Sequence, residues 1–231
     1  MRDPNRQQLE AAARVLRPLL DDRVFLGGCT TGLFLSDPAS AGLRPTRDVD
    51  TITEVASYAE YATLSDRLRA LGLSDDTSEG APLCRWRHGE LIIDIMPTSE
   101  AVLGFSNRWY VPALGSAIWM PLADVKLRVV TPVYFLATKL EAFLSRGGGD
   151  VRGSHDLEDI MTVIDGRAEI VDEVQSAPSD VRLFVTGTFH QLLAERSFVD
   201  ALSGFLMPDD ANQARLPNLV KRLTALAATR V

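Results

Sequence analysis

The chain has 231 residues and a formal charge of −7, from 24 Lys and Arg against 31 Asp and Glu. With 46% hydrophobic and 24% charged residues, the composition is typical of a globular protein and excludes a largely disordered chain. Bulk charge of this sign does not draw a protein onto a nucleic-acid backbone. A phosphate-bearing ligand therefore needs a local basic cluster, backbone N–H groups or metal ions.

The sequence indicates no membrane or secretory route. No window reaches the roughly 18 uncharged apolar residues of a membrane-spanning helix. The polar start MRDPNRQQLEAAARVL lacks the apolar segment of a signal peptide. Two cysteines, Cys29 and Cys84, are too few for a disulfide framework. We therefore expect a cytoplasmic protein without a membrane partner.

The first part of the chain predicts alternating helices and strands. In chain order we expect a helix over 5–20, a strand over 24–26, a helix over 29–36, a strand over 48–55, a helix over 57–71, strands over 83–88 and 91–96, and short strands within 108–130. Gly27-Gly28 ends the first strand, and the turn at Gly89-Glu90 joins the last long pair.

After Thr131-Pro132 the pattern becomes almost entirely helical. We expect helices over 132–145, 155–165, 168–176, 180–195, 197–206 and 212–229. The predicted fold class is α/β (α+β): a mixed-sheet core with an N-terminal helix over 1–131, followed by a C-terminal helical domain over 132–231.

The segment Arg47-Asp48-Val49-Asp50 carries the first chemical signal. In a strand, residues i and i+2 point to the same face, so Asp48 and Asp50 present two carboxylates side by side. Like charges this close repel, and a divalent cation such as Mg²⁺ relieves the repulsion. A solvated strand end with two acids is the alternative.

Asp94 lies inside the apolar strand Leu91–Met96. A buried carboxylate needs a partner, which here is an Arg, backbone donors or a metal ion. A structural salt bridge thus stays open. If this strand pairs beside the Asp48–Asp50 strand, Asp94 becomes a third metal carboxylate.

A glycine turn, Gly27-Gly28, followed by Cys29 and Thr30, lies between a strand and a predicted helix. Glycines at such a turn let backbone N–H groups approach a phosphate. Many tight turns without a ligand also contain Gly-Gly, so this turn indicates a phosphate site only in combination with the aspartates.

Taken together, the glycine turn, the D-x-D strand and the third strand aspartate resemble the nucleotidyltransferase superfamily with the DNA polymerase β-like palm. The spacing of Gly27-Gly28, Leu33 and Arg44-x-Thr46-x-Asp48-x-Asp50 is similar to the AbiEii/MenT-type toxin branch. The Lys139–Phe143 helix with Arg146, and the following His155–Ile160 segment, add to this resemblance, which spans about residues 24–165.

The resemblance implies a nucleotidyltransferase core, and we expect the active site in the cleft between this core and the helical domain. Asp48, Asp50 and Asp94 would hold two Mg²⁺ ions, and together with Lys139 they form the expected catalytic group. The residues expected to bind the nucleoside triphosphate, ATP among the candidates, are Gly27, Gly28, Cys29, Thr30, Arg47, Arg146 and Asp156. A snorkelling surface lysine is the alternative for Lys139.

Two positions depart from the branch. Cys29 stands where Ser or Thr is common after the glycines, and Thr30 is expected to take over its hydrogen bond. His155 stands where a Lys is usual. A further motif, the basic and aromatic strand Arg85–His88, is interpreted as an exposed hairpin face or as a nucleic-acid contact.

The expected reaction moves a nucleoside monophosphate from an NTP to an acceptor hydroxyl and releases pyrophosphate. By resemblance to the toxin branch, the acceptor is a tRNA 3′ end or another RNA, and a cognate antitoxin protein is the expected partner in a toxin–antitoxin system. A protein side chain or a small molecule such as an aminoglycoside stays open as acceptor. The alternatives are a metal-dependent phosphohydrolase and a catalytically silent nucleotide- or protein-binding module.

Overall fold

The computed structural model describes residues 3–37, 39–40, 42–146 and 149–228. The chain divides into two compact units. The sheet unit consists of Asp3–Thr30 and Pro45–Thr131, and the helical unit consists of Thr31–Arg44 and the part from Pro132 onward. In the described part of the chain, every helix is too short or too polar to cross a membrane.

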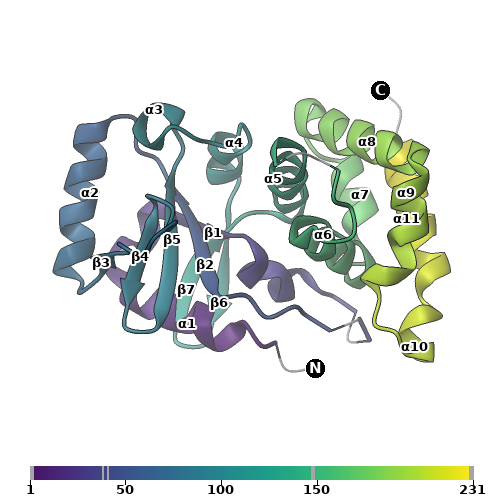
Figure 1. Ribbon diagram of the computed structural model, residues 1–231, viewed down its shortest axis with the longest axis horizontal. Coiled ribbons are helices and arrows are strands. Elements are labelled where there is room, and N and C mark those ends of the chain that lie inside the picture. The colour runs from purple at the N-terminus through teal and green to yellow at the C-terminus, as the bar shows by residue number, and fades with distance from the viewer. Residues whose placement is uncertain (1–2, 38, 41, 147–148, 229–231) are drawn as a thin grey trace. The chain divides into compact units, whose positions relative to one another are not determined.

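The sheet unit is built on one seven-stranded mixed sheet with the order β3-β4-β5-β2-β1-β7-β6 (Figure 1). The strands are β1 (Arg23–Leu26), β2 (Asp48–Thr53), β3 (Ser74–Asp75), β4 (Arg85–His88), β5 (Leu91–Pro97), β6 (Ile118–Leu122) and β7 (Val125–Val129). The central strand β2 pairs antiparallel with β1 and parallel with β5, and β1 pairs parallel with β7. The mixed sheet with helices confirms the predicted fold class.

Apolar residues at helical and strand spacing form the core of the sheet unit. Its helices are α1 (Arg6–Val15), the 3₁₀ helix η1 (Arg17–Asp22), α2 (Tyr58–Ala70), α3 (Glu100–Leu103) and α4 (Tyr110–Gly115). Helix α1 buries Leu9, Ala12 and Ala13, and it contacts β2, β5 and β7. Ser57 caps the N-terminus of helix α2, because its hydroxyl accepts a hydrogen bond from the N–H of Glu60 at 3.2 Å.

The helical unit contains α5 (Pro132–Ser145), α6 (His155–Gly166), α7 (Ile170–Gln175), α8 (Ser179–Ala194), α9 (Arg196–Ala201), η3 (Leu202–Phe205), α10 (Asp210–Gln213) and α11 (Leu216–Ala228). The segment 31–44 packs into this unit. The ring of Phe34 lies 5.0 Å from that of Phe135. The N–H groups of Ser36 and Asp37 both donate to the carbonyl oxygen of Gly166 at 2.9 Å.

Two local predictions are wrong. Residues 110–115 form helix α4 instead of a strand, and Pro112 fits there because the first turn of a helix does not use its N–H groups. The expected α-helix over 29–36 is the 3₁₀ helix η2 (Gly28–Phe34). At its start the backbone N–H of Thr30 donates to the carbonyl oxygen of Gly27 at 3.1 Å, and this three-residue spacing closes a tighter turn than an α-helix has.

Candidate functional site

Three aspartates lie on one face of the sheet. Strand β2 runs parallel to β5 with Asp50 paired to Asp94, so these two side chains point to the same side. Asp48 lies two residues before Asp50 and shares this face. The prediction that the Asp94 strand lies beside the Asp48–Asp50 strand is therefore confirmed. We call Asp48, Asp50 and Asp94 the aspartate face.

The glycine turn lies directly against this face. Leu26, the last residue of β1, pairs with Asp50, and Gly27 follows with a φ of +77°. A Cβ atom at Gly27 would lie 1.9 Å from Oδ2 of Asp50, so no side chain fits there. The predicted approach of the glycine turn to the aspartates is confirmed, and both the positive φ and the contact require glycine at this position.

Arg85, on β4, lies on the aspartate face, although it has no role at the site in our sequence-based assignment. Its Nε donates to Oδ1 of Asp94 at 2.8 Å, and its Nη2 donates to Oδ2 of Asp94 at 2.7 Å. The same Nη2 donates to Oδ2 of Asp48 at 2.8 Å. The hydrogen bonds to Asp94 raise the pKa of the guanidinium, with the charge of Asp48 acting in the same direction. The sequence left an arginine, backbone donors or a metal ion open as the partner of Asp94, and in the structure this partner is Arg85.

The sequence contains the signal that places Arg85 there. The turn at Gly89-Glu90 fixes the register of the β4–β5 hairpin, with His88 opposite Leu91. Arg85 lies three residues before His88 on β4, and Asp94 lies three residues after Leu91 on β5, so Arg85 and Asp94 are opposite each other. Arg85 is therefore a structural partner of the aspartates, which neither of our two interpretations of the Arg85–His88 strand included.

The aspartate face combines oxygen ligands with a net negative charge. Three carboxylates and one guanidinium leave a formal charge of −2 on neighbouring strands. The field of Asp94 and Asp50 reaches Cys84, where burial first and these two charges next raise the pKa of the thiol to about 12. Hard oxygen ligands and residual negative charge suit Mg²⁺. As the side chains stand, no described group of three or more His, Cys, Asp or Glu is arranged to hold a metal ion.

The residues around the glycine turn form hydrogen bonds within it. Cys29 and Thr30 are fully buried. The thiol of Cys29 lies 3.4 Å from the carbonyl oxygen of Leu26, and the hydroxyl of Thr30 donates to Gly27. Both side chains thus stabilise the turn. Arg47 is exposed, directly before β2.

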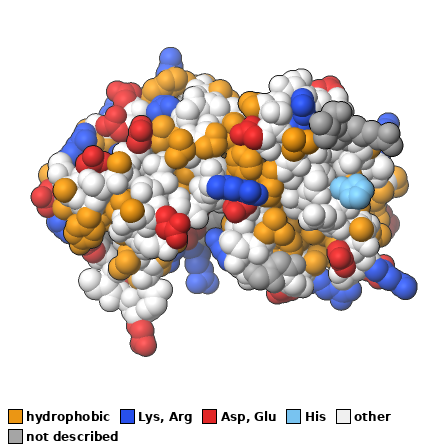
Figure 2. Space-filling view, turned by 90° about the horizontal axis from the view of Figure 1, so that it is seen from above, with side chains coloured by type: hydrophobic (Ala, Val, Ile, Leu, Met, Phe, Trp, Pro, Cys, Tyr) orange, Lys and Arg blue, Asp and Glu red, His pale blue; other side chains and the backbone are white. Residues whose placement is uncertain are grey.

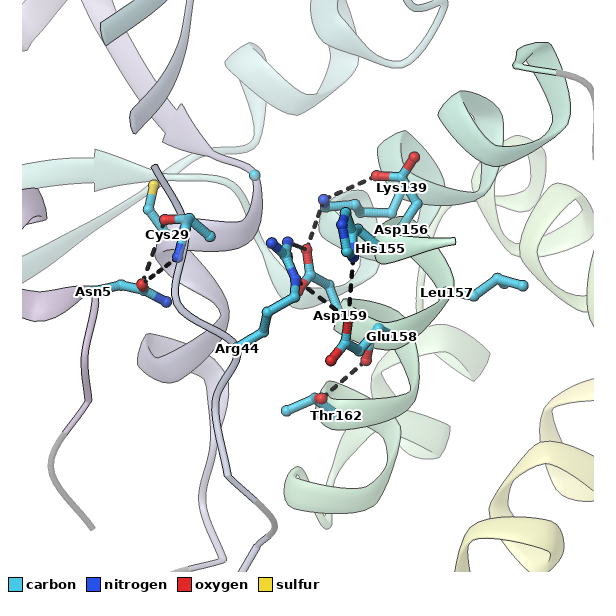
Figure 3. Close-up of polar contacts among 12 residues, drawn as sticks. Asn5, Cys29, Arg44, Lys139, His155, Asp156, Leu157, Glu158, Asp159 and Thr162 are labelled. Atoms are coloured by element: carbon cyan, nitrogen blue, oxygen red, sulfur yellow. Dashed lines mark hydrogen bonds and ion pairs between the residues drawn. The ribbon is translucent and has the colours of Figure 1, made fainter. Parts of the chain in front are cut away.

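A second group of predicted site residues lies in the helical unit (Figure 3). Nζ of Lys139, on α5, lies 2.9 Å from Oδ1 of Asp156 and 2.8 Å from Oδ2 of Asp159, both on α6. The Lys139 side chain is only 12% exposed, which excludes a snorkelling surface lysine. Nη1 of Arg146 lies 3.2 Å from Oδ2 of Asp156, and Nη2 of Arg44 lies 3.1 Å from Oδ2 of Asp159. We call these five residues the lysine network.

Asp159 has no role in our sequence-based assignment, although the i, i+3 spacing from Asp156 places both carboxylates on one helix face. Arg146 keeps a 75% exposed side chain. A hollow of about 260 Å³ in the helical unit is lined by Arg146, His155 and Asp156 together with Phe143, Asp150, Gly153 and Ser154. Lys139, Arg146 and Asp156 are therefore brought together in one unit, and Gly27, Asp48, Asp50 and Asp94 in the other.

Comparison with known proteins supports the fold. No protein-family model and no curated protein sequence matches the chain. An antigenic nucleotidyltransferase-like protein from Paracoccidioides brasiliensis, of known crystal structure, aligns with a TM-score of 0.54 and 18% identity, over 96% of this chain and 93% of that chain. A candidate nucleotidyltransferase from H. pylori aligns with a TM-score of 0.48 and 10% identity, over 98% and 96% of the two chains. The first comparison shows that the chain has a nucleotidyltransferase-like fold.

Proposed function

We propose that the protein is a metal-dependent nucleotidyltransferase that moves a nucleoside monophosphate from an NTP to an acceptor hydroxyl. The observation that carries this proposal is the aspartate face beside Gly27: three carboxylates on adjacent strands, against a turn that accepts no side chain. The nucleotidyltransferase-like fold supports it.

In this proposal Asp48, Asp50 and Asp94 hold the divalent cations, for which two Mg²⁺ ions are the candidates. Bound there, the ions would stabilise negative charge on the attacking and leaving oxygens. Arg85 balances part of the carboxylate charge, and it must release carboxylate oxygens for cations to bind. Asp94 is the candidate base for the acceptor proton, or a ligand where the acceptor binds.

At the α-phosphorus the reaction forms one bond and breaks one bond. The acceptor oxygen bonds to the α-phosphorus, the bond from that phosphorus to the bridging oxygen breaks, and pyrophosphate leaves with its electron pair. The acceptor proton passes to a carboxylate. Arg146, with an exposed guanidinium beside a hollow, is the better placed of the two predicted phosphate cations, because Lys139 already contacts two carboxylates.

We propose RNA, and a tRNA 3′ end in particular, as the acceptor on the resemblance of the motifs to the AbiEii/MenT-type toxins. A cytoplasmic location and a cognate antitoxin are part of the same proposal. On the face that Figure 2 presents, Lys and Arg side chains are interspersed with Asp and Glu. A protein or aminoglycoside acceptor is an outcome that the test below distinguishes.

One observation favours a second candidate function. Because Arg85 already forms ion pairs with Asp48 and Asp94, the fold is also compatible with a silent nucleotide-binding module that never binds catalytic metal. In that case the aspartates would be structural partners of Arg85.

The test uses the full chain, Mg²⁺, and each of the four NTPs labelled at the α- or γ-phosphate, with total RNA, total protein or an aminoglycoside as acceptor. We expect α-label in RNA and loss of that label with Asp50→Asn, whereas Asp66→Asn, on the exposed side of α2, keeps the wild-type rate. Free γ-labelled phosphate without transfer identifies a phosphohydrolase. NTP binding without turnover identifies the silent module. Wild-type transfer by Asp50→Asn refutes the proposed site.

A further inference from the structure

A cavity of about 460 Å³ lies in the sheet unit, away from the aspartate face. Its lining includes Asp22, Arg23, Thr53, Arg67, Leu114 and Arg128. We call it the Arg23 pocket. Arg23 pairs with Thr53 at one end of the β1–β2 ladder, whereas Leu26 pairs with Asp50 at the other end. Three residues of strand separate the two ends, which is about 10 Å.

The side chain of Arg23 lines the pocket with two unsatisfied donor atoms. The residue is 1% exposed, and neither Nε nor Nη2 has a hydrogen-bond partner among the described residues. A buried charge is among the most unfavourable groups in a protein unless it is paired and hydrogen-bonded. Burial accordingly lowers the pKa of the guanidinium to about 10. Either the protein tolerates this unpaired cation, or a ligand satisfies it.

The charges around Arg23 favour an anion at the bottom of the pocket. The positive charge of Arg67 lowers the pKa of Arg23 more than the negative charge of Asp22 raises it. Arg67 and Asp22 form only a loose pair, with 3.9 Å between Nη1 and Oδ2. Arg128 is fixed at the wall, because its Nη1 donates to the carbonyl oxygen of Asp21 at 3.0 Å and its Nη2 to that of Leu114 at 2.8 Å.

The rim of the pocket carries the opposite charge. Asp21, Asp22, Glu54 and Glu60 line the cavity and are exposed. Arg67 is exposed like these acids, whereas Arg23 is buried. The acidic side chains repel an extended polyanion such as RNA, but a small anionic group fits between them and reaches the arginines. A phosphate dianion offsets the repulsion between two guanidiniums, and its oxygens match the planar donors of arginine.

We propose that the Arg23 pocket binds a phosphate group, either inorganic phosphate or a phosphomonoester, with Arg23 and Arg67 as its ligands. This site lies in one unit and uses none of the residues assigned to nucleotidyl transfer. It therefore stands or falls independently of the proposed function.

Calorimetric titration of the full chain with inorganic phosphate tests the site. The titration contains a chelator and is run at constant ionic strength, so that metal and salt effects are excluded. We expect saturable binding that weakens at least tenfold in Arg67→Gln. The matched control is Arg69→Gln, on the same helix, whose guanidinium pairs with Asp66 and Asp75 outside the pocket. Arg146→Gln is also expected to keep wild-type affinity, because Arg146 lies outside the Arg23 pocket. Weaker phosphate binding in this variant would instead show that phosphate binds at the predicted nucleotide residues.

Arg23→Met gives a second readout. In phosphate-free buffer we expect its melting temperature to be higher than that of the wild type, because methionine replaces an unpaired buried charge, and we expect added phosphate to have no stabilising effect on it. Titration with ribose 5-phosphate distinguishes the sources: tighter binding than inorganic phosphate identifies a phosphomonoester site, and equal or weaker binding identifies a free-phosphate site. Absence of saturable binding to the wild type overturns the proposal, as does equal weakening by Arg67→Gln and Arg69→Gln.

Discussion

Gly27 and Asp50 lie so close together that a methyl group on the glycine would overlap Oδ2 of the aspartate, at 1.9 Å. No other described glycine with a positive φ has such a contact. Gly80 has nearly the same φ, +78°, but an added Cβ there meets no atom within 4 Å. The two positions therefore allow backbone strain and steric overlap to be measured separately.

We expect Gly80→Ala to lower the free energy of unfolding by about 1 kcal/mol, which is the effect of a left-handed backbone alone. Gly27→Ala adds overlap with Asp50, so we expect a loss of about 2–4 kcal/mol together with loss of nucleotidyl transfer. Urea denaturation and the transfer assay measure the two effects. Equal losses of stability in both variants would show that the Gly27–Asp50 contact relaxes freely.

Arg85→Gln tests the guanidinium of the aspartate face. Removing it leaves Asp48 and Asp94 without their partner, so we expect the free energy of unfolding to fall by about 2–3 kcal/mol in metal-free buffer. In the proposed function Mg²⁺ binds these carboxylates in the folded state only, so added Mg²⁺ is expected to restore part of this loss.

The matched control for that variant is Arg87→Gln. Arg87 lies on the same strand and pairs with Asp76 at 2.9 Å instead of with the three aspartates. We expect a change of at most about 1 kcal/mol and no response to Mg²⁺. If Mg²⁺ affects the thermal melting of the two variants alike, the aspartate face does not bind the cation.

Lys139→Met is expected to weaken NTP binding and also to reduce stability, because Lys139 lies between two buried carboxylates. We expect a loss of about 3 kcal/mol in the free energy of unfolding, and a smaller loss when Asp159→Asn is already present. The difference, measured by chemical denaturation of the four proteins of the cycle, gives a coupling of about 1–3 kcal/mol.

Lys126→Met, at an exposed position of β7, serves as the control for that cycle and is expected to change stability by less than about 0.5 kcal/mol. Additive effects of Lys139→Met and Asp159→Asn would contradict the lysine network as a stabilising unit.

Cys84 is expected to stay a neutral thiol across the physiological range. Burial and the charges of Asp94 and Asp50 raise its pKa to about 12, so the thiolate forms only when the pH rises toward that value. Native protein at pH 8 should therefore leave Cys84 unmodified by iodoacetamide, while urea-unfolded protein is modified. Peptide mapping measures both. Rapid alkylation of native Cys84 would show that the aspartate face opens readily to solvent.

Local sequence patterns predicted much of the sheet unit. The two-residue turn at Gly89-Glu90 predicted the β4–β5 hairpin, and the D-x-D alternation predicted which face of β2 carries the carboxylates. The partner of Asp94 stayed open because an arginine, a backbone donor and a cation satisfy a buried carboxylate equally well at the level of sequence. Register within the hairpin, once counted, points to Arg85.

Long-range packing accounts for what the sequence did not predict. The segment 31–44 reads as the end of a helix followed by a polar loop, and nothing local assigns it to the helices that come about a hundred residues later. Its place follows from the contact of Phe34 with Phe135 and from hydrogen bonds to Gly166. The roles of Lys139, Arg146 and Asp156 toward a nucleotide stay predictions, although their mutual contacts are now defined.

The interrupted path of the chain has a practical consequence for anyone who dissects this protein. A fragment starting at Pro132 would lack the segment 31–44. It would lose the ring contact of Phe34 with Phe135 and two ion pairs, Arg44–Asp159 and Asp37–Arg215, the second at 2.7 Å. Its newly uncovered apolar surface would favour aggregation. Truncation at Pro132 is therefore a poor route to an isolated helical unit. A gene that fuses residues 31–44 to the segment from Pro132 onward is the rational alternative.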